Sequence, residues 1–494
     1  MSDTGFDPSL VEITGQSNFI GGRRVRGLGQ AVPLNRPSDG TIHCDLDSAS
    51  WEQVDEACED AHRAFAESGW ATCPPRDRIR VMRRWADLIE RDARQIARLE
   101  SFCSTRPIAD STAWDVTNAA ECLRFFAELA DKQGGEVAAT RSDNLGMVLR
   151  QPYGVIGLVI PWNFPMVTTA WKVGPPLAAG NAVVVKPSEM TPYSALRLAE
   201  LAIEAGLPAG LFNVVQGTGN AVGDDLVRHA RVRKVSFTGS TATGARVMAA
   251  CAETGIKPAT LELGGKSPQI VHDDADIERA ALAISKSITG NAGQVCVAGS
   301  RLIAHESIAG ELVERIAGHF AQVRPGATWD GATTFPPIIS DLQCTRIEGI
   351  VERSRLAGAE VLVGGQRIDA CGKGAFYAPT ILTHVDMSSE AVRSEIFGPV
   401  LTVQTFAGEA EAMALADHPE YGLAAGVHTR DIGRAMRAMR AIEAGTVWIN
   451  RYGRSGDFVL PTGGFKSSGY GRDLGKQAFE AAQQIKTALI DFAD

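Results

Sequence analysis

Between residues 155 and 263 the chain alternates short apolar runs with stretches of helical length, and this alternation strongly constrains the fold. The apolar runs are rich in β-branched residues, as buried strands are, and span 155–160, 182–185, 212–215, 234–237 and 260–263. The stretches between them that we expect to be helices are 165–178, 192–205, 219–229 and 242–253. Because such alternation is typical of a parallel sheet covered on both faces, we predict an α/β fold with a Rossmann-like cofactor domain.

The residues that follow these strands are polar or glycine-rich, as expected at the edge of the sheet where ligands bind. They are Pro161-Trp162-Asn163, Lys186-Pro187-Ser188-Glu189, Gly217-Thr218-Gly219 and Thr238-Gly239-Ser240. The run 237–244 places glycine and hydroxyl groups where a helix begins, which suits a pyrophosphate although it is not the GxGxxG pattern. Gly217-Thr218-Gly219 is equally typical of a simple turn. Lys186 and Glu189 would face a ribose, where a carboxylate favours NAD over NADP by repelling a 2′-phosphate.

The remainder of the chain predicts further layers, because 494 residues are too many for one ordinary core. Upstream helices are expected over 51–69, 79–100 and 112–132. A second α/β pattern after residue 267 has strands at 269–272, 301–304, 360–363, 400–406, 424–428 and 446–449, with helices at 274–288, 307–323, 342–357 and 431–443. The apolar tail 486–491 needs a partner edge, either from another subunit or from the segment 133–151, which could form a matching arm. We predict an NAD-binding domain (1–129 and 153–264), a catalytic domain (265–467) and an oligomerisation arm (130–152 and 483–494).

Composition excludes several classes of protein. The net charge of −9 argues against broad nucleic-acid binding, and no apolar run reaches the roughly 18 residues of a membrane span. The first residues contain no apolar segment typical of a secretory signal. The nine cysteines form no CxxC pair, and neither they nor the nine histidines have metal-ligand spacing. We therefore expect a cytoplasmic protein without a metal.

Three residues carry the candidate chemistry. Cys296 follows the small, polar run 291–295, so its thiol could meet a ligand, although a lone cysteine is more often a small buried hydrophobe. A helix beginning near Cys296 would lower the pKa of the thiol. Glu262 ends an apolar strand before Gly264-Gly265 and is either a solvated carboxylate or a general base. Asn163 lies between two prolines, where its amide could form an Asx-turn or donate to an oxyanion.

Seven motifs in this order resemble those of the aldehyde dehydrogenase superfamily over nearly the whole chain. They are PWNFP, VVVKPSE, FTGST, LELGGKSP, GQVC, EIFGPV and PTGGFKSSGYGR. The resemblance implies a thiolate nucleophile at Cys296, a deacylation base at Glu262, and an oxyanion hole formed by Asn163 and the backbone N–H of Cys296. It also implies a proton relay that includes Lys172, and a homodimer or homotetramer.

The resemblance also implies the residues that bind the cofactor, NAD with NADP as an alternative. Lys186 and Glu189 would hold the adenosine ribose, Ser240 the pyrophosphate and Glu395 the nicotinamide ribose, with Phe397 beside the nicotinamide ring. The other cofactor-binding residues that we expect are Pro161, Trp162, Gly219, Phe237, Gly239 and Leu263.

The expected reaction is oxidation of a small aldehyde to its acid through a thiohemiacetal and a thioester on Cys296. A relative that transfers the acyl group to CoA is one alternative, against which Glu262 argues. A non-catalytic binding or structural role is the other.

The substrate is not fixed by these motifs. Expected tunnel residues are Asp115, Asn118, Phe164, Val167, Thr168, Trp171, Val295, Val297 and the loop 451–462, including Asp457 and Phe458. Aromatic and acidic groups here would suit a cationic ω-aminoaldehyde or betaine-type aldehyde. Arg451 and Arg454 would equally suit an anionic semialdehyde, or all these charges could lie on a solvated rim. Thr462 stands where many relatives carry phenylalanine, so an aromatic or aliphatic aldehyde stays open.

Overall fold

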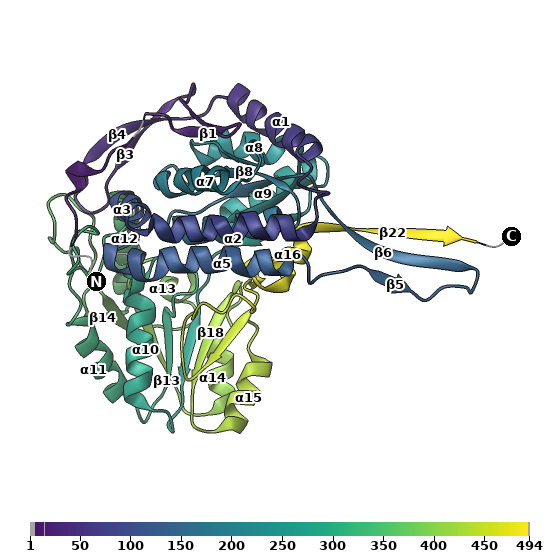
Figure 1. The fold of residues 1–494 in the computed structure, drawn as a ribbon. Helices are drawn as coiled ribbons and strands as arrows, with labels where there is room; N and C mark the ends of the chain where they lie inside the picture. Colours follow the sequence, from purple (N-terminus) through teal and green to yellow (C-terminus); the bar gives the residue numbers. More distant parts are fainter. Residues whose placement is uncertain (1–4, 14, 493–494) are drawn as a thin grey trace.

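The computed structural model describes residues 5–13 and 15–492, and most of its strands belong to three sheets (Figure 1). Residues 1–4, 14, 493 and 494, which the predicted domain ranges include, lie outside the described residues. Among the helices of the described ranges, none is both long and apolar enough to cross a membrane.

The first sheet has eight strands in the order β2-β1-β9-β8-β7-β10-β11-β21. Its parallel centre consists of β7 (Val155–Val159), β8 (Ala182–Lys186), β9 (Phe212–Val214), β10 (Val232–Thr238) and β11 (Ala259–Glu262). Antiparallel neighbours are β1 (Asn18–Ile20), β2 (Arg23–Val25) and β21 (Gly469–Tyr470), and the intervening helices are α6 (Pro165–Ala178), α7 (Tyr193–Ala205), α8 (Asp224–Arg228) and α9 (Thr241–Glu253). The predicted alternation is confirmed. The strand order reverses between β7 and β10, the switch point where sheets of this type bind ligands.

A layer of helices from the first part of the chain packs on α6 and α7 of this sheet. It comprises α2 (Pro75–Arg91), α3 (Ala93–Cys103), α4 (Ile108–Asp110) and α5 (Val116–Leu129), whereas α1 (Trp51–Glu67) contacts β7, β8, β9 and α8. The prediction of one helix over 79–100 is wrong, because the backbone leaves helical geometry at Asp92 (φ −95°, ψ 14°) and redirects α3. The third predicted helix begins with a π-helical turn, Ser111–Asp115, which widens the helix and rotates the side chains around it.

The second sheet has seven strands in the order β14-β15-β16-β13-β12-β18-β19. They are β12 (Pro268–Val271), β13 (Arg301–His305), β14 (Glu360–Val363), β15 (Thr380–Thr383), β16 (Val400–Phe406), β18 (Ala424–His428) and β19 (Thr446–Ile449). Its helices are α10 (Ile277–Thr289), α11 (Ala309–Phe320), α12 (Asp341–Leu356), α13 (Glu390–Arg393), α14 (Glu409–Ala416) and α15 (Ile432–Ala441). The sequence pattern missed β15, α13 and α14, which are short.

The third sheet pairs the tail of the chain with the arm, as predicted. The tail strand β22 (Gln483–Asp491) runs antiparallel to β6 (Asn144–Pro152) over nine residue pairs, and β5 (Glu136–Ala138) lies on the far side of β6. In Figure 1 this ribbon extends away from the rest of the molecule. Its outer surface exposes large apolar side chains, namely Val137, Ile485, Leu489, Ile490 and Phe492.

The remaining elements are small. They are a 3₁₀ turn at Pro8–Leu10, the hairpin of β3 (Ala31–Asn35) and β4 (Ile42–Asp47), the pair β17 (Tyr421–Gly422) and β20 (Phe465–Lys466), and α16 (Gly475–Ala481). Residues 468–482, which no predicted domain range includes, return to the first sheet through β21 and to its core through Phe479.

Candidate active site

Two adjoining hollows lie at the carboxyl ends of β7, β10 and β11. The first, of about 480 Å³, brings together predicted residues from both lobes. These residues are Pro161, Trp162, Asn163, Phe164, Val167, Thr168, Trp171, Gly239, Ser240, Glu262, Leu263, Val295, Cys296, Val297, Glu395, Phe397 and Thr462. The second, of about 560 Å³, is lined by Pro161, Trp162, Lys186, Glu189, Gly219, Phe237, Gly239 and Ser240. Because residues after β7 and β10 line both, the two hollows form one continuous site.

Cys296 lies in a loop that passes close to the segment after β11. Glycine allows this close approach. A Cβ atom at Gly265 would come within 2.6 Å of the Cys296 carbonyl oxygen, so only glycine fits there. The preceding Asn291 and Ala292 have positive φ angles of 48° and 51°, and no helix begins at Cys296. The expected lowering of its pKa is therefore wrong. Burial, together with the negative charges of Glu262 and Glu395, raises the pKa of the Cys296 thiol to about 12.

Asn163 is held with one amide hydrogen still free for a ligand. Its Nδ2 donates to the backbone carbonyl oxygen of Gln294 at 3.0 Å. The backbone carbonyl oxygen of Asn163 accepts from Asn291 Nδ2 at 3.1 Å. Asn291 is in turn fixed by Thr105, whose hydroxyl donates to Oδ1 at 2.7 Å. An amide nitrogen carries two hydrogens, so Asn163 can donate the second one to an oxygen in the cavity beside Cys296.

Glu262 is a buried carboxyl group whose Oε1 has no hydrogen-bond partner among the described residues. Burial raises its pKa to about 8, and the nearby negative charge of Asp473 acts in the same direction. The positive charges of Lys172, Arg454 and Arg472 oppose this rise. Close to neutral pH the group can therefore both hold and release a proton, as a general base must.

Lys172 lies behind Glu262 rather than in the cavity. Its Nζ donates to Ser236 Oγ at 2.8 Å and to Asp473 Oδ2 at 2.9 Å, and its side chain is fully buried. Asp473, which lines the cavity, is a residue that sequence reasoning missed, although it directly follows the PTGGFKSSGYGR motif. Together Lys172 and Asp473 place a fixed pair of opposite charges beside the base.

The second hollow carries the groups expected to hold a dinucleotide. Lys186 Nζ and Glu189 Oε2 lie 3.1 Å apart beyond β8, and Ser240 caps α9 by accepting from the Thr243 N–H. Glu395, which lines the first hollow, accepts from the Gly265 N–H at 2.9 Å, and burial raises its pKa to about 7.

Aromatic groups flank the passage between the two hollows. The rings of Trp162 and Phe397 meet edge to face, with centroids 5.3 Å apart. Two carboxylates, a helix N-terminus and an aromatic wall fit a nicotinamide dinucleotide along this groove.

Four predicted substrate residues do not line the cavity, and for these the prediction is corrected. Asp115 is fully buried and its carboxylate accepts from Arg106 at 2.9 and 3.0 Å. Asn118 Oδ1 accepts from Trp171 Nε1 at 3.2 Å. Asp457 is exposed and bound by Ser455, while Phe458 packs on Phe125 with ring centroids 6.2 Å apart. The acidic side chains that suggested a cationic substrate are therefore absent from the described lining.

Two other residues take their place in the wall. Trp114 lines the cavity beside Phe164, with ring centroids 6.0 Å apart, because the π-helical turn points Trp114 inward and Asp115 into the core. Arg454 also lines the cavity, with its guanidinium 5.4 Å from the centre of the Trp171 ring.

Comparison with known proteins identifies the family of this site. Residues 25–488 match the model of the aldehyde dehydrogenase family. The chain belongs to this family.

The relatives of the chain agree with this identification. It is 41% identical over 477 residues to an aldehyde dehydrogenase of Emericella nidulans, covering 96% of this chain and 95% of that protein. It is 42% identical to the NADP/NAD-dependent aldehyde dehydrogenase PuuC of Escherichia coli, covering 88% of each. Among solved structures, a γ-glutamyl-γ-aminobutyraldehyde dehydrogenase of Burkholderia cenocepacia has a TM-score of 0.95 and 40% identity, with 98% of each chain covered. An indole-3-acetaldehyde dehydrogenase of P. syringae, solved with NAD⁺, also has a TM-score of 0.95, with 38% identity and 98% of each chain covered.

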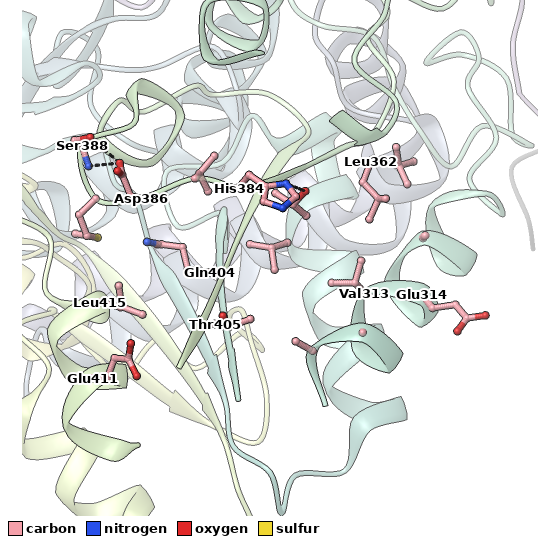
Figure 2. Close-up of a pocket in the computed structure, with 18 residues that line it drawn as sticks. Val313, Glu314, Leu362, His384, Asp386, Ser388, Gln404, Thr405, Glu411 and Leu415 are labelled. Atoms are coloured by element: carbon pink, nitrogen blue, oxygen red, sulfur yellow. Dashed lines mark hydrogen bonds between the residues drawn. The ribbon is translucent and has the colours of Figure 1, made fainter. Parts of the chain in front are cut away.

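A wider hollow of about 1160 Å³ lies between α11 and α14, over β15 and β16 (Figure 2). Its labelled side chains include His384, Asp386, Gln404 and Glu411, and no cysteine lines it. Asp386 binds the Ser388 N–H of its own loop at 2.9 Å. The nucleophile expected of this family therefore lies in the smaller hollow between the lobes.

The raised pKa of Glu262 predicts how the rate of aldehyde oxidation depends on pH in this dehydrogenase. Because only the ionised carboxylate can accept a proton, aldehyde oxidation should rise as the pH increases through about 8. Asp473→Asn removes a negative charge that raises the pKa and leaves Lys172 acting on Glu262 alone. The rise in kcat should therefore move to lower pH, measured as a pH profile of NADH formation.

The exposed Asp369 supplies the control, since Asp369→Asn should leave that profile unchanged. An unaltered profile in Asp473→Asn would show that Glu262 does not set the pH dependence.

Proposed function

We propose that this aldehyde dehydrogenase uses NAD to oxidise an aldehyde and releases the product as a free carboxylic acid. The observation that carries the proposal is that Cys296 and Glu262 line one cavity, which continues into the groove beyond β7 and β10. A nucleophile, a base with a pKa near neutrality and an adjoining dinucleotide groove are the parts that this reaction needs.

The first step is attack of the Cys296 sulfur on the aldehyde carbon. Since the thiol is protonated at neutral pH, a base must take its proton, and Glu262 is the carboxylate whose charge most strongly affects that thiol. As the S–C bond forms, the carbonyl oxygen gains negative charge. The free hydrogen of Asn163 Nδ2 and the backbone N–H of Cys296 would stabilise that oxygen, with one such donor contributing about 3 kcal/mol.

NAD, when bound, accepts the hydride from the substrate carbon and leaves a thioester on Cys296. Lys186 and Glu189 would hold its adenosine ribose and Glu395 its nicotinamide ribose. The Glu189 carboxylate would accept from a 2′-hydroxyl and repel a 2′-phosphate, so NAD is the preferred cofactor.

Glu262 then acts on water, which replaces sulfur at the acyl carbon. Glu262 first releases to solvent the proton that it took from the thiol. Its ionised form then takes one proton from the water, the resulting hydroxide displaces the Cys296 sulfur from the acyl carbon, and Glu262 returns that proton to the sulfur. Lys172 and Asp473 form a fixed pair of charges near this base and shift its pKa in opposite directions. Hydrolysis by a buried carboxylate argues against an acceptor such as CoA, and an intact thiol, base and amide argue against a non-catalytic role.

An aldehyde panel tests this proposal. Each aldehyde is supplied with NAD or NADP, with and without CoA, and NADH or NADPH and the carbon product are measured. We predict the free acid as product in every case, with NAD used more efficiently. Cys296→Ala should lose activity while still binding NAD, whereas Cys371→Ala, which changes a thiol outside the cavity, should remain active.

Two results would contradict it. Stoichiometric acyl-CoA formation would identify a CoA-acylating enzyme instead. The absence of reduced cofactor with every aldehyde would leave only a non-catalytic role.

We also propose that the chain forms a homodimer or homotetramer in the cytoplasm. The projecting ribbon of β5, β6 and β22 exposes Ile485 and Leu489 at 65% each, and such an apolar sheet surface is typically covered by another chain. All nine cysteines are free thiols, which suits a reducing compartment.

The double variant Ile485→Asp and Leu489→Asp tests this assembly by light scattering coupled to size-exclusion chromatography. The unmodified chain should elute as a dimer or tetramer, and the double variant as a smaller species because charges would be buried at the interface. Leu356→Asp, at an exposed leucine on α12, should keep the assembly. A monomeric unmodified chain would refute the proposal.

A further inference from the structure

The cavity that holds Cys296 contains a cation with no counter-ion. Arg454 follows β19 in the loop 450–462 and lines this cavity. Its Nη2 is buried, and among the described residues none accepts a hydrogen bond from it. The carboxylates of Glu262, Asp473 and Asp457 act on Arg454 through space, but none of them forms an ion pair with it among the described contacts.

Arg454 is half-buried, and leaving its buried Nη2 without an acceptor is costly, so a role for a ligand is the simplest account of its position. The guanidinium carbon of Arg454 lies 5.4 Å from the centre of the Trp171 ring, and this cation–π contact stabilises the positive charge. The ring does not accept hydrogen bonds from the N–H groups that point away from it. The planar fork of arginine can donate two parallel hydrogen bonds to the oxygens of a carboxylate, which is a common anion on a small carbon chain.

We propose that Arg454 binds a carboxylate on the substrate, so that this enzyme prefers aldehydes that carry a carboxylate at the opposite end of a short chain. The inference rests on the proposed function, because it assigns the substrate of the same cavity. The aldehyde carbon would lie at Cys296 and the carboxylate at Arg454. The aromatic wall of Trp114, Phe164 and Trp171 would cover the methylene groups between them.

The other charges near the cavity agree with an anionic substrate. A cationic aldehyde would need an acidic wall, but Asp115 is bound to Arg106 and Asp457 lies on the exposed loop. The acidic groups that do line the cavity are Glu262, Asp473 and Glu395, each with a role in the proposed reaction or in cofactor binding. The other arginine of the lining, Arg346, donates to the backbone carbonyl oxygens of Glu395 and Ile396, so Arg454 is the charge left for selecting a substrate.

Arg454 has one competing role, because its charge also lowers the pKa of the Cys296 thiol. If activation of the thiol were its function, replacing Arg454 would slow every aldehyde equally. If it binds the substrate, the loss would fall on carboxylate-bearing aldehydes alone. The two roles are therefore separable with a matched pair of substrates.

The test compares kcat/KM for a short ω-oxo carboxylate, its methyl ester and the alkanal of equal length. The unmodified enzyme should prefer the carboxylate. Arg454→Met should lose about 10- to 100-fold on the carboxylate, the usual range for a lost hydrogen bond to a charged group, and change little on the ester. Arg454→Lys should recover part of the loss. Arg451→Met, at an exposed arginine of the same loop, should match the unmodified enzyme.

Several results would overturn the proposal. Equal use of carboxylate and ester by the unmodified enzyme would do so without any variant. Equal losses on both substrates in Arg454→Met, with slower alkylation of Cys296 by iodoacetamide, would assign Arg454 to the thiol instead. Failure of the proposed function is distinguishable, since no aldehyde of the set would then yield NADH. If Arg454→Met does not fold, the substrate ratios of the unmodified enzyme and Arg454→Lys decide the question.

Discussion

The burial of Glu262, with Cys296 partly buried in the same cavity, is the constraint on which the site depends. Burial raises the pKa of the carboxyl to about 8 and of the thiol to about 12, so both groups hold protons near neutral pH. In water neither shift would exist, and Glu262 would be too weak a base to take a proton from a thiol or from water. The same burial strengthens the fixed charges of Lys172, Asp473 and Arg454 around them.

The fold creates this cavity by bringing two sheets together at their strand ends. Glu262 ends β11 of the first sheet, whereas Cys296 precedes β13 of the second, and glycine at 264 and 265 lets the two segments approach. The reversal of strand order between β7 and β10 opens the adjoining groove. A cofactor bound there would reach the thiol without crossing solvent. The chemistry of the site is therefore a consequence of where the strands end.

Much of this could be predicted from the sequence, because buried strands and the polar residues at their ends leave local patterns. The elements around 155–263 and the cavity position of Cys296, Glu262 and Asn163 were predictable for that reason. The direction in which a side chain points was not predictable. Because of the π-helical turn at 111–115, Trp114 lines the cavity where Asp115 was expected, and no residue pattern marks that turn. Asp473 returns to the first sheet by a strand of two residues, too short to leave a pattern.

The central claim is that Cys296 forms a thioester with the acyl group and that the buried Glu262 activates the water that hydrolyses this thioester. Rapid mixing of Glu262→Gln with NAD and an aldehyde, followed by mass spectrometry of the protein, tests both parts at once. This account predicts slow formation of about one NADH per subunit, because Glu262 also takes the thiol proton, then little further turnover, and the acyl group on the peptide that contains Cys296. Continued turnover at the rate of the unmodified enzyme, or an acyl group on another residue, would contradict it.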